Sequence, residues 1–112
     1  MIQLPVSTDK NQLFNITLNN QQVNIELRWQ DIGSSWYISI YDYQTNAPFI
    51  ISHRLLPNRL VFGIKYTSFI GDIFAYNIAF PDVDLPVDGF QNGFGLYYID
   101  ADEKEQVKGL IK

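Results

Sequence analysis

Residues 14–29 read FNITLNNQQVNIELRW, and this stretch decides the fold. Apolar side chains occupy every second position of residues 14–18, and the same alternation resumes over residues 23–29. Successive side chains of a strand point to opposite faces, so this period predicts two strands that each have one buried and one solvated face. The polar run at 19–22 favours a turn, because asparagine tolerates left-handed backbone geometry. We therefore expect an antiparallel hairpin.

A third strand follows the turn-forming residues 31–35. Trp36, Ile38 and Ile40 occupy its inward positions, and tyrosines stand on the opposite face. Residues 44–48 end with proline and close the strand. Residues 12–43 therefore predict a three-stranded antiparallel meander.

The rest of the chain predicts shorter strands and one long loop. Strands are expected at 49–52, 60–66, 74–80 and 94–99, because aromatic and aliphatic residues are concentrated there. In the third of these, Phe74 and Tyr76 share one face with Ile78 and Phe80. Prolines and glycines over 81–93 indicate a loop.

The tail at 100–112 is charged and is expected to form a short helix or to be disordered. Asp102 and Glu105 have the spacing of a capping box.

These elements predict one all-β domain spanning residues 1–112. About seven short strands separated by regular turns are typical of an antiparallel β-sandwich or a small β-barrel. The sequence does not choose between these two architectures. A hydrophobic content of 46% with 18% charged residues favours a packed core over disorder.

Composition argues against several classes of function. The chain has no cysteine, which excludes disulfides, thiolate zinc sites and cysteine nucleophiles. A net charge of −4 with scattered basic residues argues against nucleic acid as a partner. No apolar run approaches membrane-spanning length, and residues 1–5 lack the features of a secretory signal, so no membrane partner is expected.

The sequence predicts no catalytic residue, no metal site and no cofactor, and hence no enzyme. His53 is the only histidine, and its neighbour Ser52 should point to the other face of the strand, so the two cannot pair directly. Asp82, Asp84 and Asp88 lie in a glycine-bearing loop and have the oxygen atoms that calcium prefers. Their spacing departs from that of an EF-hand, which favours solvated turn residues.

Most aromatic residues fall at positions expected to face the core. Tyr37, Tyr41 and Tyr43 are the exception, because they share the face opposite Trp36. They form either a second core layer or a stripe that binds a partner, since tyrosine is enriched in protein interfaces. The sequence leaves both readings open, and the stripe is the candidate partner interface.

Features spread along almost the whole chain resemble the small baseplate plug proteins of contractile-tailed bacteriophages. They are, in order, Ile2-Gln3-Leu4-Pro5, Asn11-Gln12-Leu13-Phe14, Leu27-Arg28-Trp29-Gln30, the run from Trp36 to Asp42, Leu55-Leu56 and Gly95-Leu96-Tyr97-Tyr98. They mark strands and core positions, so no individual functional residue is carried over from the family.

The resemblance implies a non-enzymatic structural subunit of the virion. Such a subunit would sit in the tail baseplate and join the central hub and spike to the tail tube and the surrounding wedges. It would be assembled in the cytoplasm of the bacterial host. The alternative reading of the sequence is a carbohydrate- or receptor-binding β-module.

Overall fold

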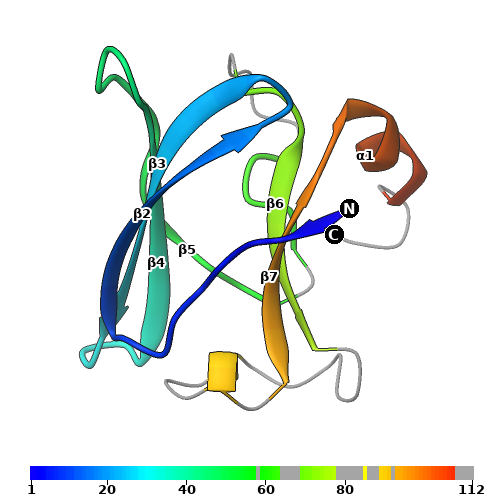
Figure 1. Cartoon of the computed structure of the whole chain (residues 1–112). Helices are drawn as coiled ribbons and strands as arrows, with labels where there is room; N and C mark the ends of the chain where they lie inside the picture. Colours follow the sequence, from blue (N-terminus) through cyan, green and yellow to red (C-terminus); the bar gives the residue numbers. More distant parts are fainter. Residues whose placement is uncertain (58, 64–68, 78–84, 86–88, 92, 108–112) are drawn as a thin grey trace.

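The computed structural model describes residues 1–57, 59–63, 69–77, 85, 89–91 and 93–107. In this part of the chain, seven strands form two antiparallel sheets, with orders β2-β3-β4-β5 and β1-β7-β6. The two sheets face each other as separate layers (Figure 1). The all-β prediction is confirmed, and the architecture is a sandwich, because the sheets do not close into a barrel. The strands are β1 (Ile2–Gln3), β2 (Asn11–Leu18), β3 (Gln21–Gln30), β4 (Ser35–Asp42), β5 (Pro48–Arg54), β6 (Asp72–Asn77) and β7 (Phe94–Ile99).

The hairpin of β2 and β3 is the regular core of the larger sheet. Its register is unbroken from the pair Asn11 and Arg28 to the pair Leu18 and Gln21. The loop is shorter than the predicted 19–22 turn and contains only Asn19 and Asn20, whose φ angles are 51° and 65°. Positive φ at both positions is the geometry of a type I′ turn, which matches the twist of the strands it joins.

The inward residues of β3 and β4 follow the predicted alternation. Leu27 lies opposite Ile38 and Ile25 opposite Ile40, and all four side chains are fully buried. β5 continues the sheet with two register shifts, and Ser52 within it has a φ of 48°. The backbone N–H of Ser52 donates to Oγ of Ser39 at 2.8 Å, which satisfies a group that the ladder leaves unpaired.

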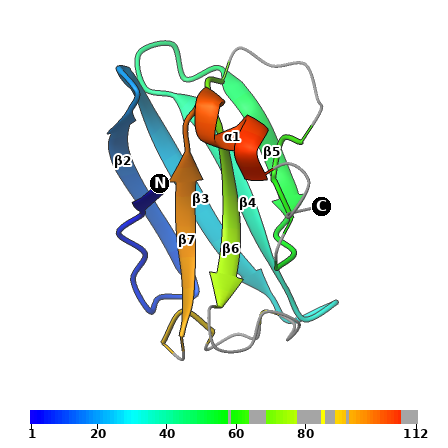
Figure 2. The same ribbon diagram turned by 90° about the vertical axis from the view of Figure 1, so that its right-hand side faces the viewer.

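The smaller sheet joins the two ends of the chain. β1 pairs with β7, with Ile2 opposite Tyr98, and β7 pairs with β6 along its whole length. Figure 2 shows this sheet in front of the larger one. A short 3-10 helix (Gly89–Gln91) precedes β7 and brings Phe90 to 5.2 Å from Trp36, measured between ring centroids.

Two strand predictions are corrected by the structure. β1 was not expected, because two residues carry no periodicity. Conversely, the described residues of the expected 60–66 strand, 60–63, form a bend and a turn, and 64–66 lie outside the described residues. The N–H of Val61 donates to the carbonyl of Ile73 at 2.9 Å, but the next N–H groups bind a side chain in place of a strand.

The direction of the aromatic side chains in β6 also differs from expectation. Ile73 and Ala75 belong to the core between the sheets, so Phe74 and Tyr76 lie on the other face. There the ring of Phe74 stacks on Tyr97 at 5.8 Å between centroids. Alternation alone could not orient this strand, because residues on both of its faces are apolar. Ile78 and Phe80, expected on the same face, lie outside the described residues.

The chain continues from β7 into helix α1 (Ala101–Val107), which lies on the side of the smaller sheet away from the larger one (Figures 1 and 2). Its capping box uses Asp100 and Glu103, two residues earlier than predicted. The N–H of Glu103 donates to Oδ1 of Asp100 at 2.8 Å, and the N–H of Asp100 donates to Oε1 of Glu103 at 3.2 Å. These reciprocal bonds satisfy the free donors at the start of the helix.

Candidate partner-binding surface

The outer face of the four-stranded sheet is the surface that the sequence singled out. Its side chains come from the positions of β2, β3 and β4 that alternate with the buried ones. No described element packs on this face, and Figure 1 shows it turned away from the smaller sheet. Within the described part of the chain, the face is therefore uncovered along most of three strands.

The three tyrosines occupy different places on this face. Tyr37 and Tyr41 belong to β4 and are half-buried by their neighbours in the sheet. Tyr43 follows the end of β4, lies in the turn and is 49% exposed. Its N–H donates to the carbonyl of Gln22 at 3.1 Å, which ties the turn to β3. The structure thus places Tyr37 and Tyr41 on one side of the sheet, and Tyr43 in the turn at its end.

A carboxylate holds the turn beside Tyr43. Oδ1 of Asp42 accepts from the N–H of Gln44 at 2.9 Å and from that of Thr45 at 3.0 Å. Hydrogen bonding from the backbone of Thr45, supported by that of Gln44, lowers the pKa of the Asp42 carboxyl below its ordinary value. Tyr43 therefore lies in a turn that these hydrogen bonds hold in place.

Two arginines flank Tyr37 across the strands. Arg28 of β3 and Arg54 of β5 are its two register partners. The Nε atom of Arg28 lies 3.9 Å from Oε1 of Glu26, and Arg54 forms no ion pair with any described residue. Glu26 thus offsets the charge of Arg28, and Arg54 leaves this part of the face with a net positive charge, in a chain whose net charge is −4.

The other end of the face is polar and uncharged. Nδ2 of Asn15 donates to Oδ1 of Asn24 at 3.2 Å, and Nε2 of Gln22 donates to Oδ1 of Asn15 at 3.0 Å. Leu13 stands in the same row of outward residues and is 67% exposed. The surface thus combines an aromatic stripe, a basic end and an amide ladder, which is the mixed character of a protein interface.

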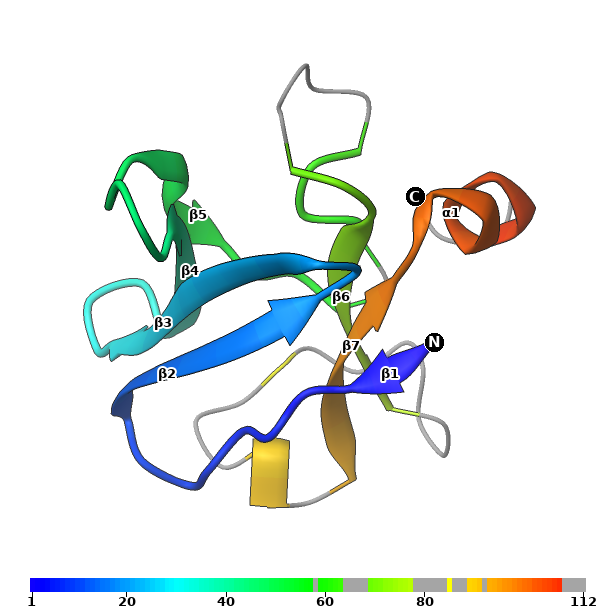
Figure 3. The same ribbon diagram turned by 45° about the horizontal axis from the view of Figure 1, so that its top comes forward.

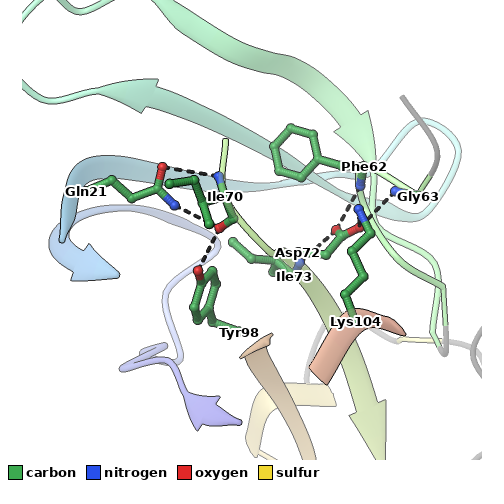
Figure 4. A network of polar contacts seen from close by, with 8 residues as sticks. All are labelled: Gln21, Phe62, Gly63, Ile70, Asp72, Ile73, Tyr98 and Lys104. Carbon is green, nitrogen blue, oxygen red and sulfur yellow. Dashed lines mark hydrogen bonds and ion pairs between the residues drawn. The ribbon is translucent and has the colours of Figure 1, made fainter. Parts of the chain in front are cut away.

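A further group of polar contacts lies on β6 of the smaller sheet, next to α1. Asp72 is completely buried, and its carboxylate accepts from the N–H groups of Phe62, Gly63 and Ile73 at 2.8–2.9 Å (Figure 4). Nζ of Lys104 lies 3.1 Å from Oδ2. The pair joins α1 to β6 and fastens the 61–63 segment, so its role is to hold the fold together.

A second contact joins the two sheets close to Asp72. The carbonyl oxygen of Ile70 accepts from the hydroxyl of Tyr98 at 2.6 Å and from Nε2 of Gln21 at 2.8 Å (Figure 4). The N–H of Ile70 donates back to Oε1 of Gln21 at 3.2 Å. Burial raises the pKa of the Tyr98 hydroxyl. Neither this contact nor the Asp72 site was predicted, because both join residues far apart in the sequence.

Two observations on the described part of the chain concern metal and ligand binding. No three histidine, cysteine, aspartate or glutamate side chains there are grouped to hold a metal ion. Asp82, Asp84 and Asp88, weighed as calcium ligands, lie outside the described residues. One hollow, of about 50 Å³, lies against Trp36, Arg54 and Leu85. Ligand pockets are typically about 300–1,000 Å³, so this hollow is too small for a substrate of ordinary size.

The described part of the chain holds no helix with the length and apolar character needed to cross a bilayer.

Comparison with protein families shows the family of the chain. A family model described as "cyanophage baseplate Pam3 plug gp18" matches residues 1–102. The chain belongs to this family. A search among curated proteins finds no match. The matched range covers both sheets and ends within α1.

Membership of the plug family gives the chain its general role. The plug is a structural protein of the tail baseplate of the virion, and it acts by contact with other baseplate components. The resemblance stated from the sequence is confirmed at this level. A structural role of this kind agrees with a sandwich in which no described element covers the outer face of the larger sheet.

Proposed function

We infer that this plug joins the central hub and spike of the baseplate to the tail tube and to the surrounding wedge components. The observation that carries the proposal is the family match over residues 1–102. The subunit assembles in the cytoplasm of the bacterial host, acts as one domain over residues 1–112, and performs no catalysis. Tyr37, Tyr41 and Tyr43 contact one of these partners.

The geometry supports the tyrosine stripe as an interface more than as a second core layer. A second layer would need an element packed on the outer face, and no described element lies there. Half-buried tyrosines also lose little conformational freedom on docking, because the flanking strands already restrict them. Arg28 and Arg54 add cationic groups beside Tyr37, and arginine is enriched in interfaces for the same reasons as tyrosine.

The carbohydrate-binding alternative requires ring faces that a sugar can stack on. Among the described aromatic side chains, only Tyr43 is more than one-third exposed. A single ring at a turn makes a poor platform for a sugar chain, so the geometry of the described residues does not favour this function.

Co-expression with the baseplate hub, spike and tail-tube proteins of the same phage tests the proposed role. We expect the plug alone to elute as a monomer or small oligomer, and to enter a larger complex when these proteins are present. Separate elution at micromolar concentrations would contradict the proposal. Proteins encoded nearby that belong to no tail structure would contradict it too.

Within that complex, Tyr41→Ala tests the stripe. We expect the variant to melt close to the wild type but to bind its partner about 2 kcal/mol more weakly, as loss of an interface anchor does. Tyr41→Phe is the matched control, because it keeps the ring and its contact area. Unchanged binding by Tyr41→Ala would exclude this tyrosine from the interface.

A further inference from the structure

The two sheets have four edges, and three of them are protected against further pairing. β1 offers only two residues. β5 begins at Pro48 and contains the irregular Ser52, whose φ is 48°. β6 is flanked by a bridge from Pro57 to Ala75 and by the hydrogen bond from Val61 to Ile73. Short strands, proline, bulges and covering segments are the usual means of blocking an edge.

The edge formed by β2 has none of these protections. The strand is eight residues long, NQLFNITL, without proline, glycine or charge. It pairs with β3 in one continuous register, and Figure 3 shows it at the margin of its sheet. A long, regular and uncharged edge is what an added strand requires.

The hairpin geometry identifies which backbone groups face outward. A two-residue loop makes Leu18 and Gln21 a hydrogen-bonded pair, and such pairs recur at every second residue of an antiparallel ladder. Counting back by two residues from this pair reaches Lys10 and Trp29, and the N–H of Trp29 does donate to the carbonyl of Lys10 at 2.8 Å. The backbone groups of the remaining positions therefore point to the free edge, namely Asn11, Leu13, Asn15 and Thr17.

No hydrogen bond from a described residue reaches these outward N–H or C=O groups. They repeat at about 7 Å along the strand, which is the spacing of the same groups in another extended backbone. The chemistry of the edge thus specifies an extended peptide as its ligand.

We propose that the free edge of β2 receives an extended segment of another baseplate protein as a fifth strand. The side chains beside the edge define the segment. On the inner side it meets the partly buried Phe14 and Ile16, and on the outer side the exposed Leu13. The segment therefore alternates, with apolar residues toward the sandwich and polar or aliphatic ones outward. The identity of the donor as a baseplate protein rests on the proposed function.

A second copy of the plug fits this edge less well than a different protein. Each copy has a net charge of −4, so two copies repel each other as they approach. A different protein of suitable charge meets no such barrier, and the baseplate supplies several.

The test uses charge added at the edge. Asn15→Lys and Thr17→Lys place an ammonium group beside the outward backbone and keep every backbone hydrogen bond between β2 and β3. Asn15→Lys also removes the side-chain bonds to Asn24 and Gln22, which Thr17→Lys keeps. Gln3→Lys is the matched control, because it adds the same charge to an exposed position of β1, in the other sheet and away from the outer face of β2, β3 and β4. All three variants are co-expressed with the same hub, spike and tail-tube proteins. We expect the edge variants to reduce recovery of the complex about tenfold and the control to leave it unchanged.

Hydrogen exchange in the free plug provides a second measurement that does not depend on the variants. The amides of Leu13, Asn15 and Thr17 should exchange rapidly while those of Phe14 and Ile16 are protected. In the complex the first group should become protected as well.

Three outcomes would overturn the inference. Assembly of the edge variants at wild-type levels would show that the edge is not used, while leaving the role in the baseplate intact. A homodimer of the free plug that Asn15→Lys dissociates, seen by light scattering, would show that a second copy is the occupant. Failure of the wild-type plug to bind any of these proteins would instead overturn the proposed function, and with it the donor named here.

Discussion

The larger and the smaller sheet are built from the chain in opposite ways. β2 to β5 follow one another in sequence and pair as neighbours, whereas the smaller sheet brings Ile2 beside Tyr98. The larger sheet buries aliphatic side chains and leaves its polar groups outside. The smaller one depends on a buried carboxylate, Asp72, with partners from three segments. Local periodicity is enough to form the first sheet, while specific polar contacts between distant segments hold the second.

In the larger sheet, we expect the greatest loss of stability from a change at Trp36. This side chain is 1% exposed and packs edge-on against Trp29 and Phe90, with ring centroids 5.7 and 5.2 Å away. Trp36→Ala should lower the free energy of unfolding by about 3–5 kcal/mol, measured by urea denaturation. Tyr41→Ala, on the other face of the same strand, is the control and should cost far less. If Trp36→Ala and Tyr41→Ala lower the free energy of unfolding equally, the face that carries the tyrosines is also part of a core.

The smaller sheet should be most sensitive at Asp72. In Asp72→Asn the amide nitrogen would replace an oxygen that accepts from Gly63 and lies beside Lys104, so donors would face donors. We expect a loss of about 3 kcal/mol, since hydrogen bonds to a buried charge are broken without replacement.

Lys104→Gln is the matched control for Asp72. It removes the ion pair but keeps the three backbone bonds, and should cost about 1 kcal/mol. An Asp72→Asn protein as stable as the wild type would show that packing alone holds this sheet.

The contact between the sheets should give the smallest effect. Tyr98→Phe removes one donor from the carbonyl of Ile70, which keeps its bond from Gln21, so the loss should be about 1 kcal/mol.

The Tyr98 contact should also respond to alkaline pH. Burial raises the pKa of Tyr98 in the folded state, so its contribution is complete below the ordinary tyrosine pKa of about 10 and is lost as pH rises toward the higher folded value. The stability difference between wild type and Tyr98→Phe should therefore shrink above pH 10. A stability difference that stays constant above pH 10 would contradict the burial of the Tyr98 hydroxyl.

The same contrast explains how much of the fold could be predicted. The meander over 12–43 was predicted with correct faces, because alternation and turn residues are local signals. The 60–63 segment was wrongly predicted as a strand, since burial of Val61 and Phe62 looks the same whether their N–H groups bind a ladder or a carboxylate. Asp72 follows a glycine, and no local pattern marks it as a buried carboxylate.

The candidate surface shows a similar division. Tyr37 and Tyr41 were correctly expected opposite Trp36, because strand geometry determines the side of each residue. Their role toward a partner stays a prediction. The free edge of β2 could not have been inferred from alternation, because which strands lie at an edge depends on the pairing of the whole sheet.

The pairing of β1 with β7 has a consequence for synthesis on the ribosome. Residues 11–54 can fold as a meander while they emerge, since each strand finds its neighbour immediately before it in the chain. Ile2 and Gln3 leave the ribosome before the meander but must wait for residues 97 and 98 before they can pair. Residues 2 and 3 therefore stay unpaired while the intervening chain is made, and the smaller sheet closes only after β7 has emerged.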